Sequence, residues 1–270
     1  MRVCVIVPAA GAGTRFGGDK LAENLGGRPV LLRTIELFAR RAEVATIVVA
    51  GPPGEEEFAL FRDRYGAQLS FHGARLIRGG RRERWETVLL ALAEVPESCS
   101  HVAIHDAARP CASEALIDRV FAAAAFHPAV IPGVSVSSTL KRVGSDACTL
   151  GLTDPLADAI LGPASEGQSS GSIRGRKVIE TVPRSGLVAI QTPQVFERPL
   201  LQEAYFQGER VGTLAGATDD AQVVERSGVE VMVVEGEARN IKVTTPDDLV
   251  LVRAIMAAQN DHDRPSGTRR

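Results

Sequence analysis

Short apolar runs rich in β-branched residues alternate with longer amphipathic segments through the first half of the chain. Such alternation is typical of a mostly parallel sheet, because each helix returns the chain to the same end of the sheet. The predicted strands cover 3–7, 46–50, 101–105 and 129–134, and the predicted helices cover 29–42, 55–65, 84–94 and 113–126. We therefore expect an α/β fold, with a Rossmann-like, mostly parallel twisted sheet and helices on both faces.

The alternation stops after residue 136. Residues 137–186 show little periodicity and many Gly and Ser, most of all at 162–177 (GPASEGQSSGSIRGRK). Such a segment buries too little apolar surface to offset the entropy of ordering the chain. We expect 137–186 to be an extended arm with a flexible insertion, within a single domain over 1–258. Beyond the arm the sequence predicts a strand within LVAIQTPQVF, helices over 199–206 and 219–227, a strand at VEVMVV and a helix from 246 to about 258.

Composition narrows the classes of partner and location. The chain has 270 residues and a net charge of −2, with no long basic stripe, which disfavours nucleic acid. The apolar runs are of strand length and the first begins by Val3, so we expect no signal peptide, no membrane span and a cytoplasmic location. The four cysteines lack Cys-x-x-Cys spacing, which favours reduced thiols over a zinc site or disulfides. The polar tail 259–270 is expected to be disordered.

A glycine-rich loop, within VIVPAAGAGTRFGGDK at 5–20, follows the first predicted strand. It leaves the carboxyl end of that strand, where open α/β sheets bind their ligands. Glycine exposes backbone N–H groups that can surround phosphate oxygens, and Arg15 and Lys20 add positive charge. We interpret the segment as a phosphate-binding loop, with an ordinary glycine-rich turn as the alternative.

Two well-known phosphate loops do not fit the letters. A dinucleotide fingerprint needs glycine where Phe16 stands and an acid closing the second strand, which TIVVAGPP lacks. A P-loop needs lysine directly after its second glycine and then Ser or Thr, but here Asp19 intervenes and Leu21 follows the lysine. A different kind of phosphate loop is the better interpretation.

The stretch HVAIHDAARP at 101–110 places an acid at the carboxyl end of another buried strand. Asp106 is then expected at the same sheet edge as the glycine loop, where a carboxylate suits Mg²⁺. The alternative is a cap for the helix that follows. We expect His105 to be a packed or hydrogen-bonded histidine rather than a base.

In their order, these and later motifs resemble the 2-C-methyl-D-erythritol 4-phosphate cytidylyltransferases of the non-mevalonate isoprenoid pathway. The resemblance runs from residue 3 to about residue 258 and implies a fold of the nucleotidyltransferase type. The motifs that carry it are PAAGAGTR at 8–15, Lys20, Gly79-Gly80, Glu83-Arg84, Thr87, HDAARP at 105–110, Thr139, Lys141, Arg184, TPQ at 192–194, Thr218-Asp219 and NIK at 240–242.

The resemblance implies CTP and a polyol phosphate as substrates, Mg²⁺ as cofactor, held by Asp106, and a homodimer formed through the arm. It also implies a role for each matching residue. The catalytic residues would be Arg15, Lys20 and Lys242. The nucleotide would be bound by Ala9, Ala10, Gly11, Ala12, Gly13, Thr14, Gly80, Arg81 and Thr87. The second substrate would be bound by Asp106, Arg109, Thr139, Arg184, Thr192 and Thr218.

Two other functions stay open. One is a sister cytidylyltransferase for another polyol phosphate, such as ribitol 5-phosphate, although HDAARP favours the methylerythritol phosphate enzyme. The other is a catalytically silent nucleotide-binding protein, although the presence of Arg15, Lys20, Asp106 and Lys242 together argues against it. A phosphate monoester is already an anionic nucleophile near neutral pH, so the expected reaction needs cations rather than a base.

Overall fold

The computed structural model describes residues 1–11, 16–150 and 173–262. The chain forms two compact units. The first comprises Met1–Val134 together with the chain from Ile190 onward, and the second is Ser135–Ala189. The second unit contains the arm that the sequence predicted at 137–186.

The main sheet has eight strands, in the order β10-β7-β11-β6-β1-β4-β5, with β12 also paired to β7. Strand β11 runs antiparallel between β6 and β7, whereas β1, β4, β5 and β6 are parallel, as are β7 and β12. The sheet is therefore mostly parallel. Its strands are β1 (Val3–Pro8), β4 (Val44–Gly51), β5 (Ala74–Arg78), β6 (His101–Ile104), β7 (Ala129–Ser135), β10 (Val188–Ile190), β11 (Gln194–Glu197) and β12 (Met232–Glu235).

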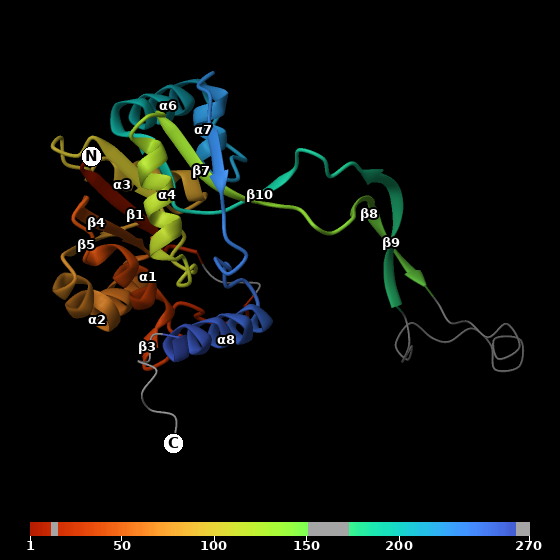
Figure 1. Cartoon of the computed structure of the whole chain (residues 1–270), viewed down its shortest axis with the longest axis horizontal. Coiled ribbons are helices and arrows are strands. Elements are labelled where there is room, and N and C mark those ends of the chain that lie inside the picture. The colour runs from red at the N-terminus through yellow and green to blue at the C-terminus, as the bar shows by residue number, and fades with distance from the viewer. Residues whose placement is uncertain (12–15, 151–172, 263–270) are drawn as a thin grey trace, which may run out of the picture. The chain divides into compact units, whose positions relative to one another are not determined.

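Helices cover both faces of this sheet (Figure 1). Along β1, Val3, Val5 and Val7 face one core, and Cys4 and Ile6 face the other, so the strand is apolar throughout. The first core is covered by α1 (Val30–Ala39), α2 (Glu55–Phe71), α4 (Glu114–Ala124) and α8 (Pro246–His262). The second is covered by α3 (Arg84–Leu92), α6 (Arg198–Val211) and α7 (Asp220–Arg226).

The second unit contains an antiparallel pair of strands, β8 (Leu140–Leu150) and β9 (Ile173–Val182), with irregular register around Val143 (Figure 1). The sequence predicted an arm here but no strands. Most of the predicted flexible insertion, at 162–177, lies outside the described residues. A small antiparallel pair, β2 (Asn24–Leu25) and β3 (Arg28–Pro29), lies between the glycine loop and α1.

Several predicted boundaries were wrong. Helix α2 continues to Phe71 and α6 to Val211, beyond the predicted ends at 65 and 206. Helix α8 continues to His262, so residues 259–262 are helical and not part of a disordered tail, while 263–270 lie outside the described residues. Strand β5 was not predicted. Among the described residues, no helix is both long and apolar enough to cross a membrane.

Candidate active site

Two clefts open at the carboxyl edge of the parallel strands, both within the first unit. The larger has a volume of about 630 Å³ and extends from the glycine loop, past Gly80 and Thr87, to Asp106 and Lys242. The smaller has a volume of about 260 Å³. Its lining includes Arg84, Asp106, Arg109, Thr192, Thr218 and Lys242.

The glycine loop begins directly at the end of β1. Ala9 is fixed to the sheet because its N–H donates to the Ala50 carbonyl at 2.7 Å. Ala9, Ala10 and Gly11 line the larger cleft. The other predicted loop residues, Ala12, Gly13, Thr14 and Arg15, lie outside the described residues, so their roles stay predictions.

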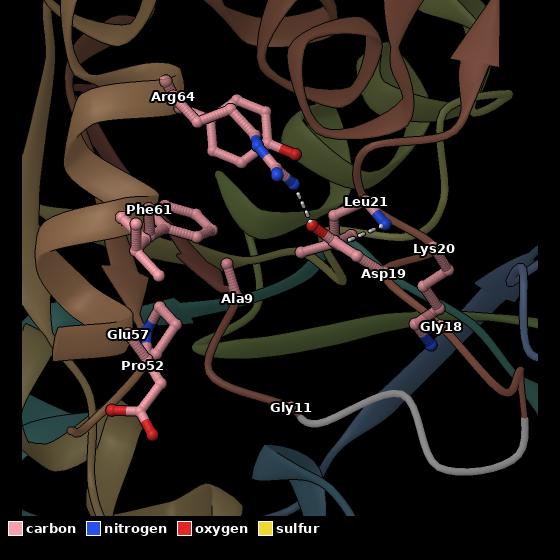
Figure 2. Close-up of a pocket in the computed structure, with 12 residues that line it drawn as sticks. Ala9, Gly11, Gly18, Asp19, Lys20, Leu21, Pro52, Glu57, Phe61 and Arg64 are labelled. Atoms are coloured by element: carbon pink, nitrogen blue, oxygen red, sulfur yellow. Dashed lines mark hydrogen bonds and ion pairs between the residues drawn. The ribbon is translucent and has the colours of Figure 1, made fainter.

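Asp19 ties the far end of this loop to α2. Its carboxylate forms an ion pair of 2.7 Å with Arg64 and accepts a hydrogen bond of 3.2 Å from the N–H of Leu21. Figure 2 shows Arg64 and Asp19 pointing toward each other beside a pocket of about 380 Å³. The residue that interrupts a P-loop pattern thus anchors the loop to the neighbouring helix.

Lys20 and Lys242 both line the larger cleft, although they come from opposite ends of the sequence. The Lys20 Nζ donates to the carbonyl oxygen of Val243 at 2.9 Å, directly beside Lys242. The N–H of Val243 donates in turn to the Ala108 carbonyl at 2.8 Å. These bonds join the glycine loop, the segment before α8 and the loop after β6.

The glycine pair after β5 lets three backbone segments approach closely. A Cβ on Gly79 would lie 2.7 Å from the Gly51 carbonyl oxygen and 2.8 Å from the Ala10 Cβ. A Cβ on Gly80 would lie 2.2 Å from the Cβ of Glu86. The N–H of Gly80 donates to the Thr87 hydroxyl at 3.0 Å. Of the predicted nucleotide-binding residues at this end, Gly80, Arg81 and Thr87 all line the larger cleft.

Asp106 lines both clefts and forms ion pairs with two cationic side chains there. Its Oδ2 lies 3.1 Å from the Lys242 Nζ and 3.0 Å from the Arg109 Nε. Burial alone would raise the pKa of Asp106. The positive charges of Lys242, Arg109 and Arg84 outweigh burial and hold that pKa below its usual value. The carboxylate is therefore ionised at neutral pH.

His105 and Thr192 form a hydrogen-bonded chain that fixes the backbone of Asp106. The Nε2 of His105 lies 3.0 Å from the Arg109 carbonyl oxygen, which can only accept, so Nε2 carries the proton. The Nδ1 then accepts from the Thr192 hydroxyl at 3.1 Å, and that hydroxyl accepts from the N–H of Asp106 at 3.1 Å. Burial lowers the pKa of His105 to about 4, so its ring is neutral at neutral pH. His105 is the packed, hydrogen-bonded residue that the sequence predicted.

Asn240 holds the segment that carries Lys242 against this chain of hydrogen bonds. Its buried side-chain amide donates to the Thr192 carbonyl at 2.8 Å. The backbone carbonyl oxygen of Asn240 accepts a hydrogen bond from the Arg109 Nη1 at 2.7 Å. The predicted motif at 240–242 therefore positions Lys242 by direct bonds to two other predicted site residues.

The residues predicted to bind the second substrate fall into two groups. Asp106, Arg109, Thr192 and Thr218 line the smaller cleft. Thr139 and Arg184 belong to the second unit and are exposed. They flank the paired ends of β8 and β9, where Arg184 Nη1 donates to the carbonyl of Ser137.

Arg84 is a site residue to which the sequence assigned no role. It begins α3, four residues after Gly80, and lines both clefts. The detectable sequence feature was a charged pair, Glu83-Arg84, at a predicted helix start. That feature alone does not separate a ligand-binding arginine from a solvated one.

The described residues contain no cluster of three or more His, Cys, Asp or Glu side chains able to hold a metal ion. Asp106 nevertheless fits the way proteins hold Mg²⁺ beside a nucleotide, because one carboxylate with substrate phosphates and water completes that coordination. Its Oδ2 bonds Lys242 and Arg109, while no described residue bonds Oδ1. Any magnesium site here would depend on bound substrate.

The Thr192 hydroxyl gives a prediction on stability. Thr192→Val preserves side-chain shape but leaves the Asp106 N–H and the His105 Nδ1 without a partner. Since an unpaired buried polar group costs about 1–3 kcal/mol, we expect the free energy of unfolding in urea to fall by at least that amount. Thr192→Ser keeps the hydroxyl and should stay close to wild type. Equal stability of the two variants would contradict this account of the hydrogen-bonded chain.

Comparison with known proteins assigns the chain to a family. A family model described as 2-C-methyl-D-erythritol 4-phosphate cytidylyltransferase matches residues 3–157 and 168–258. The chain is 39% identical to the protein of that name from Frankia casuarinae, over 95% of this chain and 82% of the relative. It is 34% identical to the protein of the same name from Alkaliphilus metalliredigens, over 97% of this chain and 96% of the relative.

A solved structure agrees with this assignment. The crystal structure of 2-C-methyl-D-erythritol 4-phosphate cytidylyltransferase from Thermus thermophilus aligns with a TM-score of 0.68 and 33% sequence identity, over 95% of this chain and 100% of that chain. The predicted nucleotidyltransferase-type fold is thereby confirmed. The chain belongs to the 2-C-methyl-D-erythritol 4-phosphate cytidylyltransferase family.

Proposed function

We propose that this chain transfers the cytidylyl group of CTP to 2-C-methyl-D-erythritol 4-phosphate and releases pyrophosphate. One observation carries the proposal: a cleft bounded by a glycine loop and a second, cation-lined cleft meet at Asp106 and Lys242. In this proposal the larger cleft takes CTP and the smaller takes the polyol phosphate. Membership of the family supports both substrates.

The chemistry requires little covalent participation by the protein. An oxygen of the acceptor phosphate forms a bond to the α-phosphorus of CTP, the bond to the bridging oxygen breaks, and pyrophosphate leaves with that electron pair. The attacking phosphate is already anionic, so no side chain has to remove a proton. Consistent with this, both ring nitrogens of His105 are bonded within the protein. The protein has instead to offset the repulsion between two anions and to align them.

Lys20 and Lys242 are the cations that we assign to this task. Lys20 approaches from the glycine loop and Lys242 from the segment before α8, so the two enter the larger cleft from different elements. Lys242 also lines the smaller cleft, and Lys20 does not. We therefore propose that Lys20 acts on the triphosphate and Lys242 on the reacting phosphates, with Arg15 of the glycine loop as a third catalytic cation.

We further propose that Asp106 holds Mg²⁺ when substrate is bound, through the carboxylate oxygen that no described residue bonds. Bound Mg²⁺ would supply positive charge that offsets the charge of the phosphates. Lys242 and Arg109 keep the carboxylate ionised and hold it in place.

Pyrophosphate release tests the reaction and its substrates. With CTP, methylerythritol phosphate and Mg²⁺, we expect pyrophosphate to be released, and excess EDTA to abolish the release. Ribitol 5-phosphate as acceptor, and UTP or ATP as donor, should react far more slowly. Equal turnover with ribitol 5-phosphate would favour the sister activity, and no turnover with any pair would favour a silent nucleotide-binding protein.

The two lysines give a second test. Lys20→Ala and Lys242→Ala should each lower turnover on the order of 10²- to 10³-fold, as for other preorganised groups that stabilise charge in the transition state. CTP affinity should fall more for Lys20→Ala, because Lys20 also binds the ground-state triphosphate. Arg62→Ala, at an exposed cation of α2 that lines neither cleft, serves as the control. Near-native turnover by Lys242→Ala would show that Lys242 is only a surface lysine.

We also propose that two copies assemble through the arm. Val178 and Ile179 of β9 are 51% and 64% exposed in the single chain, and apolar side chains of this kind favour burial against a partner. Sedimentation velocity at micromolar concentration should give the mass of a dimer, and Ile179→Lys should shift the population toward monomer. A wild-type protein that remains monomeric at every concentration would exclude the assembly.

A further inference from the structure

Arg84 occupies an unusual place in the site. Among the residues that the structure describes, only three line both clefts: Arg84, Asp106 and Lys242. The proposed function already assigns roles to the other two. The position of Arg84 is thus where the proposed nucleotide and acceptor meet, which is where two negative charges approach each other.

A buried carboxylate fixes the Arg84 side chain. The Arg84 Nη2 donates to the Oδ2 of Asp220 at 2.6 Å, and the Asp220 side chain is fully buried. The other carboxylate oxygen accepts from the Tyr205 hydroxyl at 2.6 Å. Both carboxylate oxygens of Asp220 are therefore hydrogen-bonded. Tyr205 of α6 and Asp220 of α7 together fix the side chain of Arg84, the first residue of α3.

Arg84 retains donors that the protein does not use. No described residue accepts a hydrogen bond from its Nε or Nη1, and the side chain is 28% exposed. Of the other cations of the smaller cleft, Arg109 is more fully engaged, because it bonds Asp106 and also donates to the Asn240 carbonyl. Lys242 bonds Asp106. One nitrogen of Arg84 thus bonds a buried carboxylate, while two others have no acceptor among the described residues and can donate to an anion.

We propose that Arg84 is a further catalytic residue, which binds the phosphate of the acceptor at the junction of the two clefts. This inference rests on the proposed function. The Nε and Nη1 of Arg84 can each donate a charge-assisted hydrogen bond to a phosphate oxygen, and an arginine that is already ordered loses little freedom on binding. Asp220 and Tyr205 are positioning residues, which act only by holding the guanidinium.

The competing explanation is that the Arg84–Asp220 pair merely joins α3 to α7. A double variant separates the two explanations, because Arg84→Gln with Asp220→Asn removes both charges together and leaves no unpaired charge buried. If the pair only joins two helices, a double variant that still folds should keep its activity. If Arg84 binds phosphate, activity should fall, because an amide carries no positive charge.

The experiment measures pyrophosphate release while each substrate is varied in turn, together with the thermal midpoint of each protein. For the double variant we expect kcat/KM for methylerythritol phosphate to fall on the order of 10²-fold, as when other preorganised electrostatic groups are removed. The KM for CTP and the thermal midpoint should change little. Arg84→Lys keeps the charge but not the several fixed donors of the guanidinium, so it should lose less activity than the double variant.

Arg198→Gln is the matched control. Arg198 is also partly buried and begins a helix, but its guanidinium bonds Cys99 and Gln202 and lines neither cleft. Its kinetic constants should stay at wild-type values.

Two results would overturn the inference. One is a folded double variant with wild-type kcat/KM for the acceptor, and the other is a loss that falls equally on CTP. If the double variant does not fold, Arg84→Lys decides on the same measurements, and wild-type constants for both substrates would reject the assignment. Failure of the proposed function is distinct, because the wild-type protein would then release no pyrophosphate.

Discussion

The ion pairs of Asp106 with Lys242 and Arg109 are the interactions on which the site depends. The pair with Lys242 joins the loop after β6 to the segment before α8, which lie far apart in the sequence, and the pair with Arg109 is formed within that loop. Because the carboxylate is largely buried, removing one partner would leave charge poorly compensated. The two clefts share Asp106, so a displacement of this residue would alter both at once.

Much of the fold was predictable because local pattern and final environment agree. The run VCVIVP is apolar on both sides and is buried on both faces of the sheet, so its sequence alone indicates a central strand. The sequence ARLIR does not, because β5 pairs with β4 alone in the sheet and mixes charged with apolar residues. The pairing of β8 with β9 links segments separated by a long stretch of Gly and Ser, which periodicity cannot reveal.

Some residues of the site could be selected from the sequence, and others could be recognised only from the structure. Motifs and order were enough to select Lys20, Asp106 and Lys242, which all line the larger cleft. Arg84 was not assigned a role because its partner, Asp220, lies far along the chain and the two side chains meet only after folding. Thr192 was selected as a substrate ligand, yet its hydroxyl bonds His105 and the backbone of Asp106. Those bonds require β11 to lie beside β6, which no local pattern indicates.

Strands β10 and β11 both lie beside β7, and this arrangement bears on how the family can vary. The chain leaves the sheet at the end of β7 and returns to it at β10, beside the same strand. The connection between two such points can lengthen with only a slow rise in loop-closure entropy. The residues that the family model leaves unmatched, 158–167, fall within this connection. Insertions and deletions can therefore accumulate there over evolution while the register that places Thr192 beside Asp106 is preserved.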